Sequence, residues 1–219
     1  MSEPPADVRR HNQPARGHCT ATLYEATASE WRRRAGGSAA PEVAVDPAIR
    51  ASWSGAAVAG PAYTVRGSGG DNLALHRAVV AAPSSHVLVA DVEGAAHGHW
   101  GEILAVAAQQ RGILGRVIDG GVRDRDRLRA LDFPVFSRHD CVRGTRKDVA
   151  GELGVPIRLG GVPVRTGDLL VGDADGVVVV PAERVPAVLD EADRRVAHEH
   201  DILAALRAGR TTLDLYGLG

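Results

Sequence analysis

The chain has 219 residues, a formal net charge of −1 and a hydrophobic content of 44%, with only 4% aromatic residues. This apolar fraction excludes wholesale disorder, and the near-neutral charge gives no electrostatic case for a nucleic-acid partner or an anionic membrane. Glycine occupies 26 positions, whereas a usual share of about 7% would give about 15. The glycines follow no three-residue period, which excludes collagen, so the excess predicts tight turns between aliphatic strands and a site lined by backbone.

The sequence shows no framework of disulfides and no targeting segment. Its two cysteines, Cys19 and Cys141, are expected to pack as small apolar residues in a reduced, cytoplasmic protein. No apolar run approaches the ~18 residues of a membrane span, and the polar residues 1–17 lack the apolar segment of a secretory signal. We therefore expect a flexible N-terminal lead-in over 1–17 and one domain over 18–219.

The first part of the domain is expected to alternate between helices and strands. A helix over 19–35 is stopped by Gly36 and Gly37, and 38–54 is expected to be loop. The following elements are a strand at 62–66, a helix that opens near Asp71, a strand at 86–91, a helix at 100–112 that ends at Gly112, a strand at 115–121, a helix at 122–131 and a strand at 133–138. This alternation indicates parallel βαβ units.

The pattern changes from residue 155 onward. Short strands separated by tight turns are expected at 155–159, 162–165, 168–173 and 176–181, which indicates an antiparallel or mixed addition to the sheet. A long amphipathic helix over roughly 181–208 follows, and Gly209 ends it. The sequence therefore predicts one compact α/β domain.

Two strand-to-helix junctions, VLVAD…HGHWGEILA and GRVIDGGVRDRDRL, carry most of the residues suited to chemistry. Ligands of parallel α/β proteins bind beyond the carboxyl ends of the strands, where helix N-termini offer free N–H groups. The helix start at Gly101 would supply such groups, and Gly120 with Gly121 would let the backbone approach a ligand closely.

Arg123 and Asp124 place opposite charges at the second of these helix starts. An arginine can bind a carboxylate through two hydrogen bonds, and a carboxylate can hold Mg²⁺ while its other ligands stay water. The pair therefore predicts a site for a small carboxylate ligand plus a metal. The alternative is a solvated, ion-paired helix face, because Arg125, Asp126 and Arg127 continue the alternation of charge.

One spacing links the two junctions, namely Glu102, twenty intervening residues, and then Arg123-Asp124. From about residue 19 to its C-terminus, the chain resembles the RraA-like family. The resemblance rests on this spacing and on the segments GPAYTVR, DNLALHRAV, WGEILAVAAQQRGILGRVIDGGVRDRDRL and VPIRLGGVPVRTGDLLVGDADGVVVVP. This family includes metal-dependent 4-hydroxy-4-methyl-2-oxoglutarate/4-carboxy-4-hydroxy-2-oxoadipate aldolases and regulators of ribonuclease activity. The resemblance implies an α-β-β-α sandwich of the swivelling β/β/α type, assembled as a homotrimer or hexamer.

The resemblance also implies roles for the charged residues. Asp124 would be the direct protein ligand of Mg²⁺ or Mn²⁺, and Arg123 would bind the pyruvoyl part of the substrate and stabilise enolate charge. Glu102 would hold a water molecule of the metal. Glu199 in the C-terminal helix resembles a glutamate that reaches the site of a neighbouring subunit, and a simple surface glutamate is the alternative.

Beside Gly101, the backbone amides of Ile103 and Leu104 would bind a substrate carboxylate. The implied reaction is a class II retro-aldol cleavage of a 4-hydroxy-2-keto acid to pyruvate and a second carbonyl compound. The same enolate chemistry would decarboxylate oxaloacetate. The alternatives are a non-catalytic regulator that binds a ribonuclease and a diverged enzyme of specialised metabolism, the latter motivated by the unusual run Thr22–Ala26. This run and the basic connection 139–154 both depart from the family pattern and are expected to border the pocket.

Several polar residues near the junctions allow more than one interpretation. His97 and His99 form an HxH pair that could bind a metal, shape selectivity at the mouth of the pocket, or simply belong to a loop. Asp71 and Asn72 either cap a helix or line the pocket. His76 is expected to be structural or to support the site from behind.

Overall fold

The computed structural model describes residues 17–34 and 40–219. The expected lead-in, apart from its last residue, and the helix stop at Gly36 and Gly37 therefore lie outside the described residues. No helix within these two ranges is both long enough and apolar enough to span a membrane.

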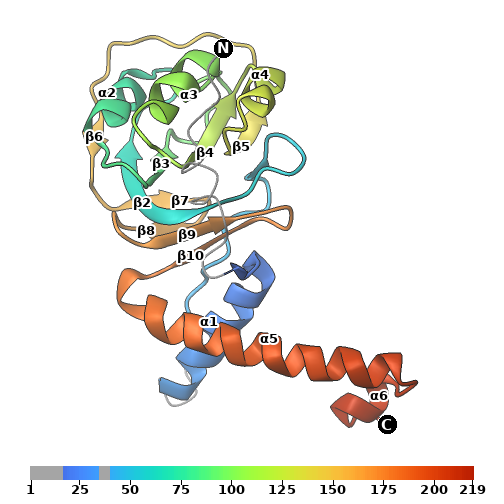
Figure 1. The fold of residues 1–219 in the computed structure, drawn as a ribbon. Coiled ribbons are helices and arrows are strands. Elements are labelled where there is room, and N and C mark those ends of the chain that lie inside the picture. The colour runs from blue at the N-terminus through green and yellow to red at the C-terminus, as the bar shows by residue number, and fades with distance from the viewer. Residues whose placement is uncertain (1–16, 35–39) are drawn as a thin grey trace.

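A mixed eight-stranded sheet runs through the described part of the molecule (Figure 1). Its order is β1-β5-β4-β3-β2-β9-β10, and the short β6 pairs with β2. Strands β2 to β5 are parallel, as the alternation predicts, whereas β9 and β10 run antiparallel to their neighbours. The strands are β1 (Arg50–Ala51), β2 (Val58–Arg66), β3 (Val87–Asp91), β4 (Gly115–Val122), β5 (Val135–Asp140), β6 (Glu152–Leu153), β9 (Leu169–Gly172) and β10 (Val177–Val180).

The two faces of the parallel strands are both covered, which is why β3 is aliphatic at successive positions. Leu88 and Ala90 point toward a core shared with α2 (Leu73–Ala81), α3 (Glu102–Gln109) and α4 (Arg125–Ala130). Val87 and Val89 point the other way, toward a hairpin of β7 (Ile157–Leu159) and β8 (Val162–Val164).

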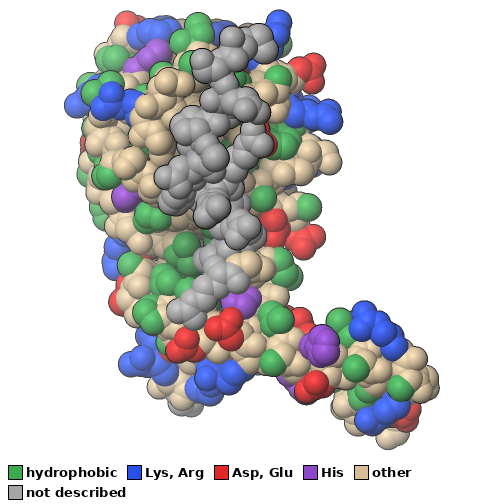
Figure 2. Space-filling model, viewed as in Figure 1, with side chains coloured by type: hydrophobic (Ala, Val, Ile, Leu, Met, Phe, Trp, Pro, Cys, Tyr) green, Lys and Arg blue, Asp and Glu red, His purple; other side chains and the backbone are tan. Residues whose placement is uncertain are grey.

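A further helical layer covers β9 and β10. Helices α1 (Thr20–Arg34) and α5 (Val185–Arg207) pack together on this pair of strands through Leu23, Val178 and Val188. The succession of helices, parallel strands, antiparallel strands and helices confirms the expected α-β-β-α sandwich. The far end of α5, with α6 (Thr212–Tyr216), projects away from the body (Figures 1 and 2).

The structure corrects several expected boundaries. Strand β2 starts at Val58, because its first four residues pair with β9 before the rest pairs with β3. The helix expected at 122–131 begins only at Arg125, because Asp124 adopts a left-handed conformation with φ of 60°. A 3₁₀ turn at Ala182–Arg184 precedes α5. The short strands β1 and β6 and the helix α6 were not expected.

Gly120 and Gly121 serve the packing of the chain rather than the approach of a ligand. A Cβ atom on Gly121 would lie 2.5 Å from the carbonyl oxygen of His97, and one on Gly120 would overlap with the side chain of Val92. The space above both glycines is therefore filled by the chain's own segment 92–99. The expectation that a ligand approaches the backbone at these two residues is wrong.

One charged side chain lies inside the core under the helices. Arg116 of β4 is 0% exposed, and none of its guanidinium nitrogens has a hydrogen-bond partner among the described residues. Its Cζ atom lies 4.9 Å from the centroid of the Trp100 ring, and burial lowers the pKa of Arg116 to about 9. A buried cation–π contact contributes about 2 kcal/mol, whereas desolvation of an unpaired ion opposes folding by several kcal/mol. We therefore expect Arg116 to lower the stability of the folded chain.

Replacing Arg116 by methionine should raise the free energy of unfolding at pH 7 by about 1–4 kcal/mol, because the buried charge disappears while the volume is kept. The folded-state pKa lies below that of the unfolded chain, so the folded protein loses its proton first as the pH rises. The advantage of Arg116→Met should therefore shrink above pH 9. Urea unfolding at pH 7 and pH 10 measures both effects.

Arg129→Met, which removes an exposed arginine of α4, is the matched control and should leave the free energy of unfolding unchanged. An Arg116→Met protein less stable than the wild type at pH 7 would show that the guanidinium stabilises the core.

Candidate functional site

The carboxyl end of β4 and the N-terminus of α3 meet at one edge of the sheet. A bridge joins Trp100 to Val122, and the Arg123 N–H donates to the Trp100 carbonyl oxygen over 2.9 Å. This pairing brings Glu102 next to Asp124, and the Glu102 N–H donates to Asp124 Oδ2 over 3.1 Å. The structure thus brings together the acidic residue and the Arg-Asp step that the sequence singles out.

The carboxylate of Asp124 turns away from its own helix. Asp124 occupies the N-cap position of α4 with φ of 60° and ψ of 35°, yet its side chain makes no capping hydrogen bond there. A left-handed conformation in a residue other than glycine opposes folding by about 1–3 kcal/mol and is typical of functional sites. The side chain instead reaches the first turn of α3, where a Cβ atom on Gly101 would overlap with Oδ2. Gly101 is therefore needed for this contact.

Arg123 lies beside this carboxylate without being tightly bound to it. Its Nε atom is 3.8 Å from Asp124 Oδ2, and the two side chains are 45% and 39% exposed. The aliphatic part of Arg123 packs closely over Gly98, where a Cβ atom would lie 2.9 Å from Cδ. Because an exposed ion pair of this length is weak, both charged groups stay available to a ligand.

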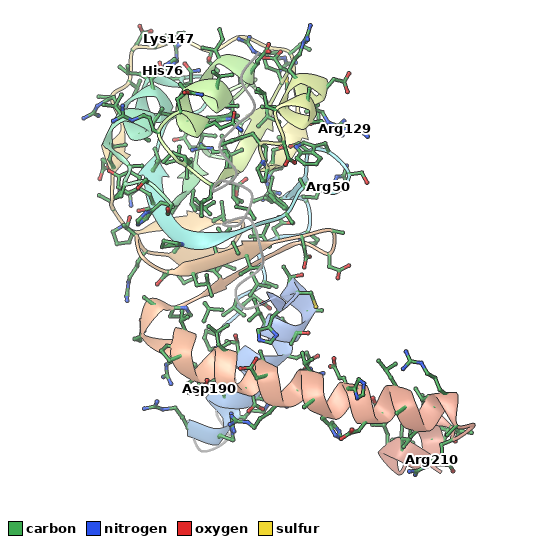
Figure 3. The ribbon with its side chains drawn as sticks, viewed as in Figure 1. Arg50, His76, Arg129, Lys147, Asp190 and Arg210 are labelled. Carbon is green, nitrogen blue, oxygen red and sulfur yellow. The ribbon has the colours of Figure 1, made fainter. Side chains whose placement is uncertain are left out.

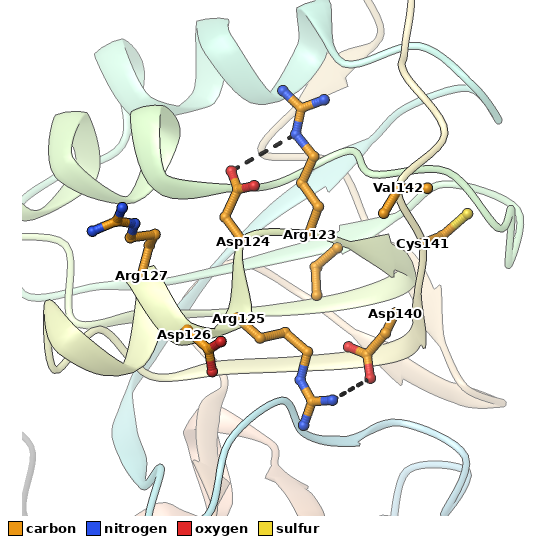
Figure 4. Close-up of a pocket in the computed structure, with 9 residues that line it drawn as sticks. Arg123, Asp124, Arg125, Asp126, Arg127, Asp140, Cys141 and Val142 are labelled. Atoms are coloured by element: carbon orange, nitrogen blue, oxygen red, sulfur yellow. Dashed lines mark ion pairs between the residues drawn. The ribbon is translucent and has the colours of Figure 1, made fainter.

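Two adjoining cavities open at this edge and share Arg123 and Asp124. The smaller, of about 100 Å³, is enclosed by α2, α3 and the loop after β5. The larger is an open groove of about 550 Å³ that runs along α4 to Cys141 and Val142 (Figure 4). The smaller cavity is lined by Asn72, His76, Gly98, His99, Gly101, Ile103, Leu104, Arg123, Asp124 and Lys147.

The alternative of an ion-paired helix face accounts for only part of the charged run. Arg125 pairs with Asp140 over 3.0 Å and points away from α3, whereas Arg123 and Asp124 point toward it (Figure 4). The charged run therefore has two parts. Arg123 and Asp124 line the smaller cavity, and Arg125 forms an ion pair with Asp140.

The loop between β5 and β6 crosses over the start of α2 and closes one side of the smaller cavity (Figure 1). The N–H of Arg146 donates to the Gly70 carbonyl, and the Arg146 carbonyl accepts from Asn72 N–H. Next to it, the Asp148 N–H donates to Asp71 Oδ2 over 2.7 Å. These bonds hold residues 146–148 against the helix start.

Asp71 links this loop to the helix. Its Oδ1 accepts from the Leu73 N–H over 2.9 Å while Oδ2 holds the loop. Burial acts to raise the pKa of Asp71, but the backbone hydrogen bonds from Asp148 and Leu73 outweigh it and hold the pKa below its ordinary value. Both sequence interpretations of the Asp71-Asn72 step hold in part, because Asp71 bonds the helix start and Asn72 lines the cavity.

The two histidines of the HxH pair do not form a metal centre in the described structure. His99 is 0% exposed, and its Nε2 accepts from the Gly70 N–H over 3.0 Å. Burial lowers the pKa of His99, so the neutral ring is favoured. The described ranges contain no group of three or more His, Cys, Asp or Glu side chains placed to hold a metal. His99 therefore supports the wall of the cavity from within.

Glu199 is not part of the site within one chain. It lies in the C-terminal half of α5, and its carboxylate pairs with Arg195 Nε over 2.9 Å. The expectation that it reaches a neighbouring subunit stays a prediction.

The sequence does not identify Lys147 as a site residue, and it gives His76 only a structural or supporting role. Both line the smaller cavity, His76 from the second turn of α2 and Lys147 from the loop above it. Only the long-range bonds of the neighbouring Arg146 and Asp148 place Lys147 here, so no local sequence signal identifies it.

Asp71→Ala should release the loop, because it removes a hydrogen bond between a buried carboxylate and the Asp148 N–H. Hydrogen bonds to charged groups contribute about 1.5–3 kcal/mol, so tryptic cleavage after Arg146 and Lys147 should accelerate by about tenfold or more. Limited proteolysis followed by mass spectrometry measures the rate at each bond. Cleavage after Arg129 serves as the internal control, and an unchanged rate at 146–147 would contradict the role of Asp71.

Comparisons with known proteins support one family. The family model described as RraA-like: Aldolase/RraA matches residues 20–179. A protein of Halalkalibacterium halodurans named "Putative 4-hydroxy-4-methyl-2-oxoglutarate aldolase" is 41% identical over 143 residues, which are 65% of this chain and 68% of that protein.

Two solved structures are similar in fold. An uncharacterized protein from Pseudomonas syringae pv. tomato has a TM-score of 0.78 and 28% identity, covering 96% of this chain and 93% of that one. The RNA-processing inhibitor RraA from Thermus thermophilis has a TM-score of 0.58 and 28% identity, covering 63% of this chain and 84% of that one. Glu102, Arg123 and Asp124 of this chain meet at one edge of the sheet. Because the family model also spans most of the chain, this protein belongs to the RraA-like family.

Proposed function

We propose that the chain is a divalent-metal-dependent lyase that cleaves a 4-hydroxy-2-keto acid to pyruvate and a second carbonyl compound. The observation that carries the proposal is the exposed Asp124 carboxylate, held at the N-terminus of α3 beside Glu102 and Arg123. The similarity to the aldolase-named protein of H. halodurans agrees with this chemistry. Decarboxylation of oxaloacetate would use the same residues.

The residues fit Mg²⁺ or Mn²⁺ bound mainly through water. Asp124 offers one carboxylate, and its Oδ2 has a single N–H donor, which leaves lone pairs free. Mg²⁺ is commonly held by one or two carboxylates with several waters retained, so a cluster of three protein ligands is not required. Once bound, the metal would polarise the 2-keto group of the substrate.

The first turn of α3 would bind the carboxylate next to the keto group. The first intrahelical bond is the one that the Ala105 N–H donates to the Gly101 carbonyl, so the N–H groups of Ile103 and Leu104 precede it. An anion at this helix start is favoured by the free N–H groups and the helix dipole.

Arg123 would bind the pyruvoyl part of the substrate and stabilise the negative charge of the developing enolate. Glu102 would orient water at the metal. Glu199 would complete the site of a neighbouring subunit in a homotrimer or hexamer, where it would take part in proton transfer.

The alternative is a regulator that binds a ribonuclease, which the likeness to the RNA-processing inhibitor RraA supports. A surface used only for binding a protein has no need for a carboxylate and an arginine that converge on a helix start inside a cavity. We therefore favour the lyase.

Asp124→Ala and Arg123→Ala should each lower pyruvate release by at least about 10²-fold, because each removes a charge that acts on the transition state. Lactate-dehydrogenase-coupled detection of pyruvate, with 4-hydroxy-2-keto acids and oxaloacetate as substrates, measures the rate. Chelation should abolish the wild-type rate, and added Mg²⁺ or Mn²⁺ should restore it. Arg129→Met is the control, and pyruvate release that survives in both alanine variants would exclude the proposed site.

Gly101→Ala tests the contact between Asp124 and α3. The added Cβ would overlap with Asp124 Oδ2 and displace the carboxylate. Since a misplacement of about 1 Å can lower a rate by about 10²-fold, we expect a loss of this size together with weaker Mn²⁺ binding by titration calorimetry. The control is Gly144→Ala, where a Cβ atom meets nothing within 4 Å. Full activity in Gly101→Ala would argue against the contact.

A further inference from the structure

Two buried side chains near β4 carry hydrogen-bond donors that have no acceptor among residues 17–34 and 40–219. The guanidinium nitrogens of Arg116 and the indole Nε1 of Trp100 are unpartnered there, although the two residues are only 0% and 1% exposed. The guanidinium carbon lies 4.9 Å from the centroid of the indole ring, so both groups belong to one region of the core. Buried donors are nearly always paired in native proteins, so these donors require a partner.

His99 adds a third donor to this region. Its Nε2 atom accepts from the Gly70 N–H over 3.0 Å, so the neutral ring carries its hydrogen on Nδ1. This Nδ1 atom is also buried and has no acceptor within the described ranges. Burial is the main cause of the lowered pKa of His99, and the charge of Arg116 acts in the same direction, which places the two side chains near each other. Arg116, Trp100 and His99 therefore form a buried donor cluster.

No acidic side chain of the described ranges neutralises the buried donor cluster. Burial alone shifts the pKa of Arg116, whereas a nearby carboxylate would raise it. Two buried side-chain oxygens also lack a partner, but Glu30 belongs to α1, where it pairs with Arg184, and Asn72 is neutral and lines the smaller cavity. The apolar side chains packed around Trp100 offer no acceptor. The cluster thus combines a full positive charge with an excess of donors.

A monatomic anion matches this cluster in charge, in hydrogen bonding and in size. It would supply the negative charge that a buried guanidinium group requires, and it accepts from several N–H groups at once. A water molecule could bond to some of the donors but would leave the charge uncompensated. Neither cavity at the candidate site is lined by Arg116 or Trp100, so an anion as large as sulfate has no route to them.

We propose that the buried donor cluster binds a halide ion, with chloride as its abundant natural ligand. The ion would lie between β4, which carries Arg116, and the segment before α3, which carries His99 and Trp100. This segment is also joined to the end of β4 by the bond from the Arg123 N–H to the Trp100 carbonyl oxygen. The halide would therefore hold the two together behind the candidate site and offset the desolvation of Arg116. The inference does not depend on the proposed lyase activity.

The test uses bromide as the probe, because bromide has the charge of chloride and scatters anomalously. Urea unfolding of the full chain at pH 7 is compared in sodium gluconate and in sodium bromide, both at about 0.5 M so that general screening is equal. Gluconate is too large to reach the cluster. An ion that binds only the folded state stabilises it by mass action, so bromide at about ten times its Kd should lower the unfolding equilibrium constant about tenfold.

Three variants separate the site from a general effect of salt. Arg116→Met removes the charge and keeps the volume, so its response to bromide should fall to within about twofold. Trp100→Phe keeps an aromatic ring but loses one donor, and it should bind bromide a few-fold more weakly than the wild type. Arg129→Met removes an exposed cation of α4 (Figure 3) and should keep the full wild-type response.

Crystals grown with bromide provide a direct measurement. The anomalous difference map should show an ion within about 3.5 Å of a guanidinium nitrogen of Arg116, and Arg116→Met crystals should lack it. A wild type whose stability does not respond to bromide would show that water satisfies the donors, and this result would overturn the site. An equal response in Arg116→Met, or anomalous peaks confined to the surface, would overturn it as well.

Discussion

The contact between the Asp124 carboxylate and the Glu102 N–H is the constraint on which the site depends. It joins a residue that follows β4 to a residue that starts α3, across twenty-one intervening positions. Three local requirements meet there. Asp124 must adopt a left-handed backbone, residue 101 must lack a Cβ atom, and the Trp100–Val122 bridge must set the register. Each is unfavourable or restrictive by itself, and the parallel sheet supplies the framework that enforces them.

Four of the glycines have a clear role in the same region. Gly98, Gly101, Gly120 and Gly121 all lie where a Cβ atom would meet another part of the chain within 3 Å. They allow the segment before α3 to lie directly on β4. This close packing brings Glu102 next to Arg123 and Asp124 at the carboxyl end of the strand. Gly98 and Gly101 both line the smaller cavity, and Gly101 also allows the contact with Asp124. Gly120 and Gly121 lie behind it and fix the path of the segment that carries Trp100 and Glu102.

Most of the sheet order, and the charged residues at the ends of two strands, could be predicted from the sequence. Alternating helices and aliphatic strands predict the parallel order of β2 to β5, since helical crossovers permit little else. The family spacing identifies Glu102, Arg123 and Asp124, which are local to two strand ends. Lys147 could not be placed in this way, because its position depends on Asp71, which lies far away in sequence.

The burial of Arg116 could not be predicted from the sequence for a related reason. A single arginine in an aliphatic strand suggests an edge or a bulge, whereas the structure buries it against Trp100. Helix α6 was missed because its signal is a five-residue segment with a capping box of Thr211 and Asp214, too short for a periodic pattern. Tertiary contacts decide these cases, and local propensity does not.

Arg123 and Asp124 interact only weakly with each other, and this weak interaction leaves both charges free to bind other groups. The Arg123–Asp124 pair is 3.8 Å long and more than one third exposed on both sides, and pairs of this kind contribute at most about 1 kcal/mol. A divalent cation at Asp124 would replace that interaction readily, because its charge is doubled and the carboxylate is already oriented by α3. Arg123, anchored by its stem over Gly98, would then turn its guanidinium group to the substrate. A tighter salt bridge would stabilise the fold slightly more, but it would compete with the metal and the keto acid that we propose for this site.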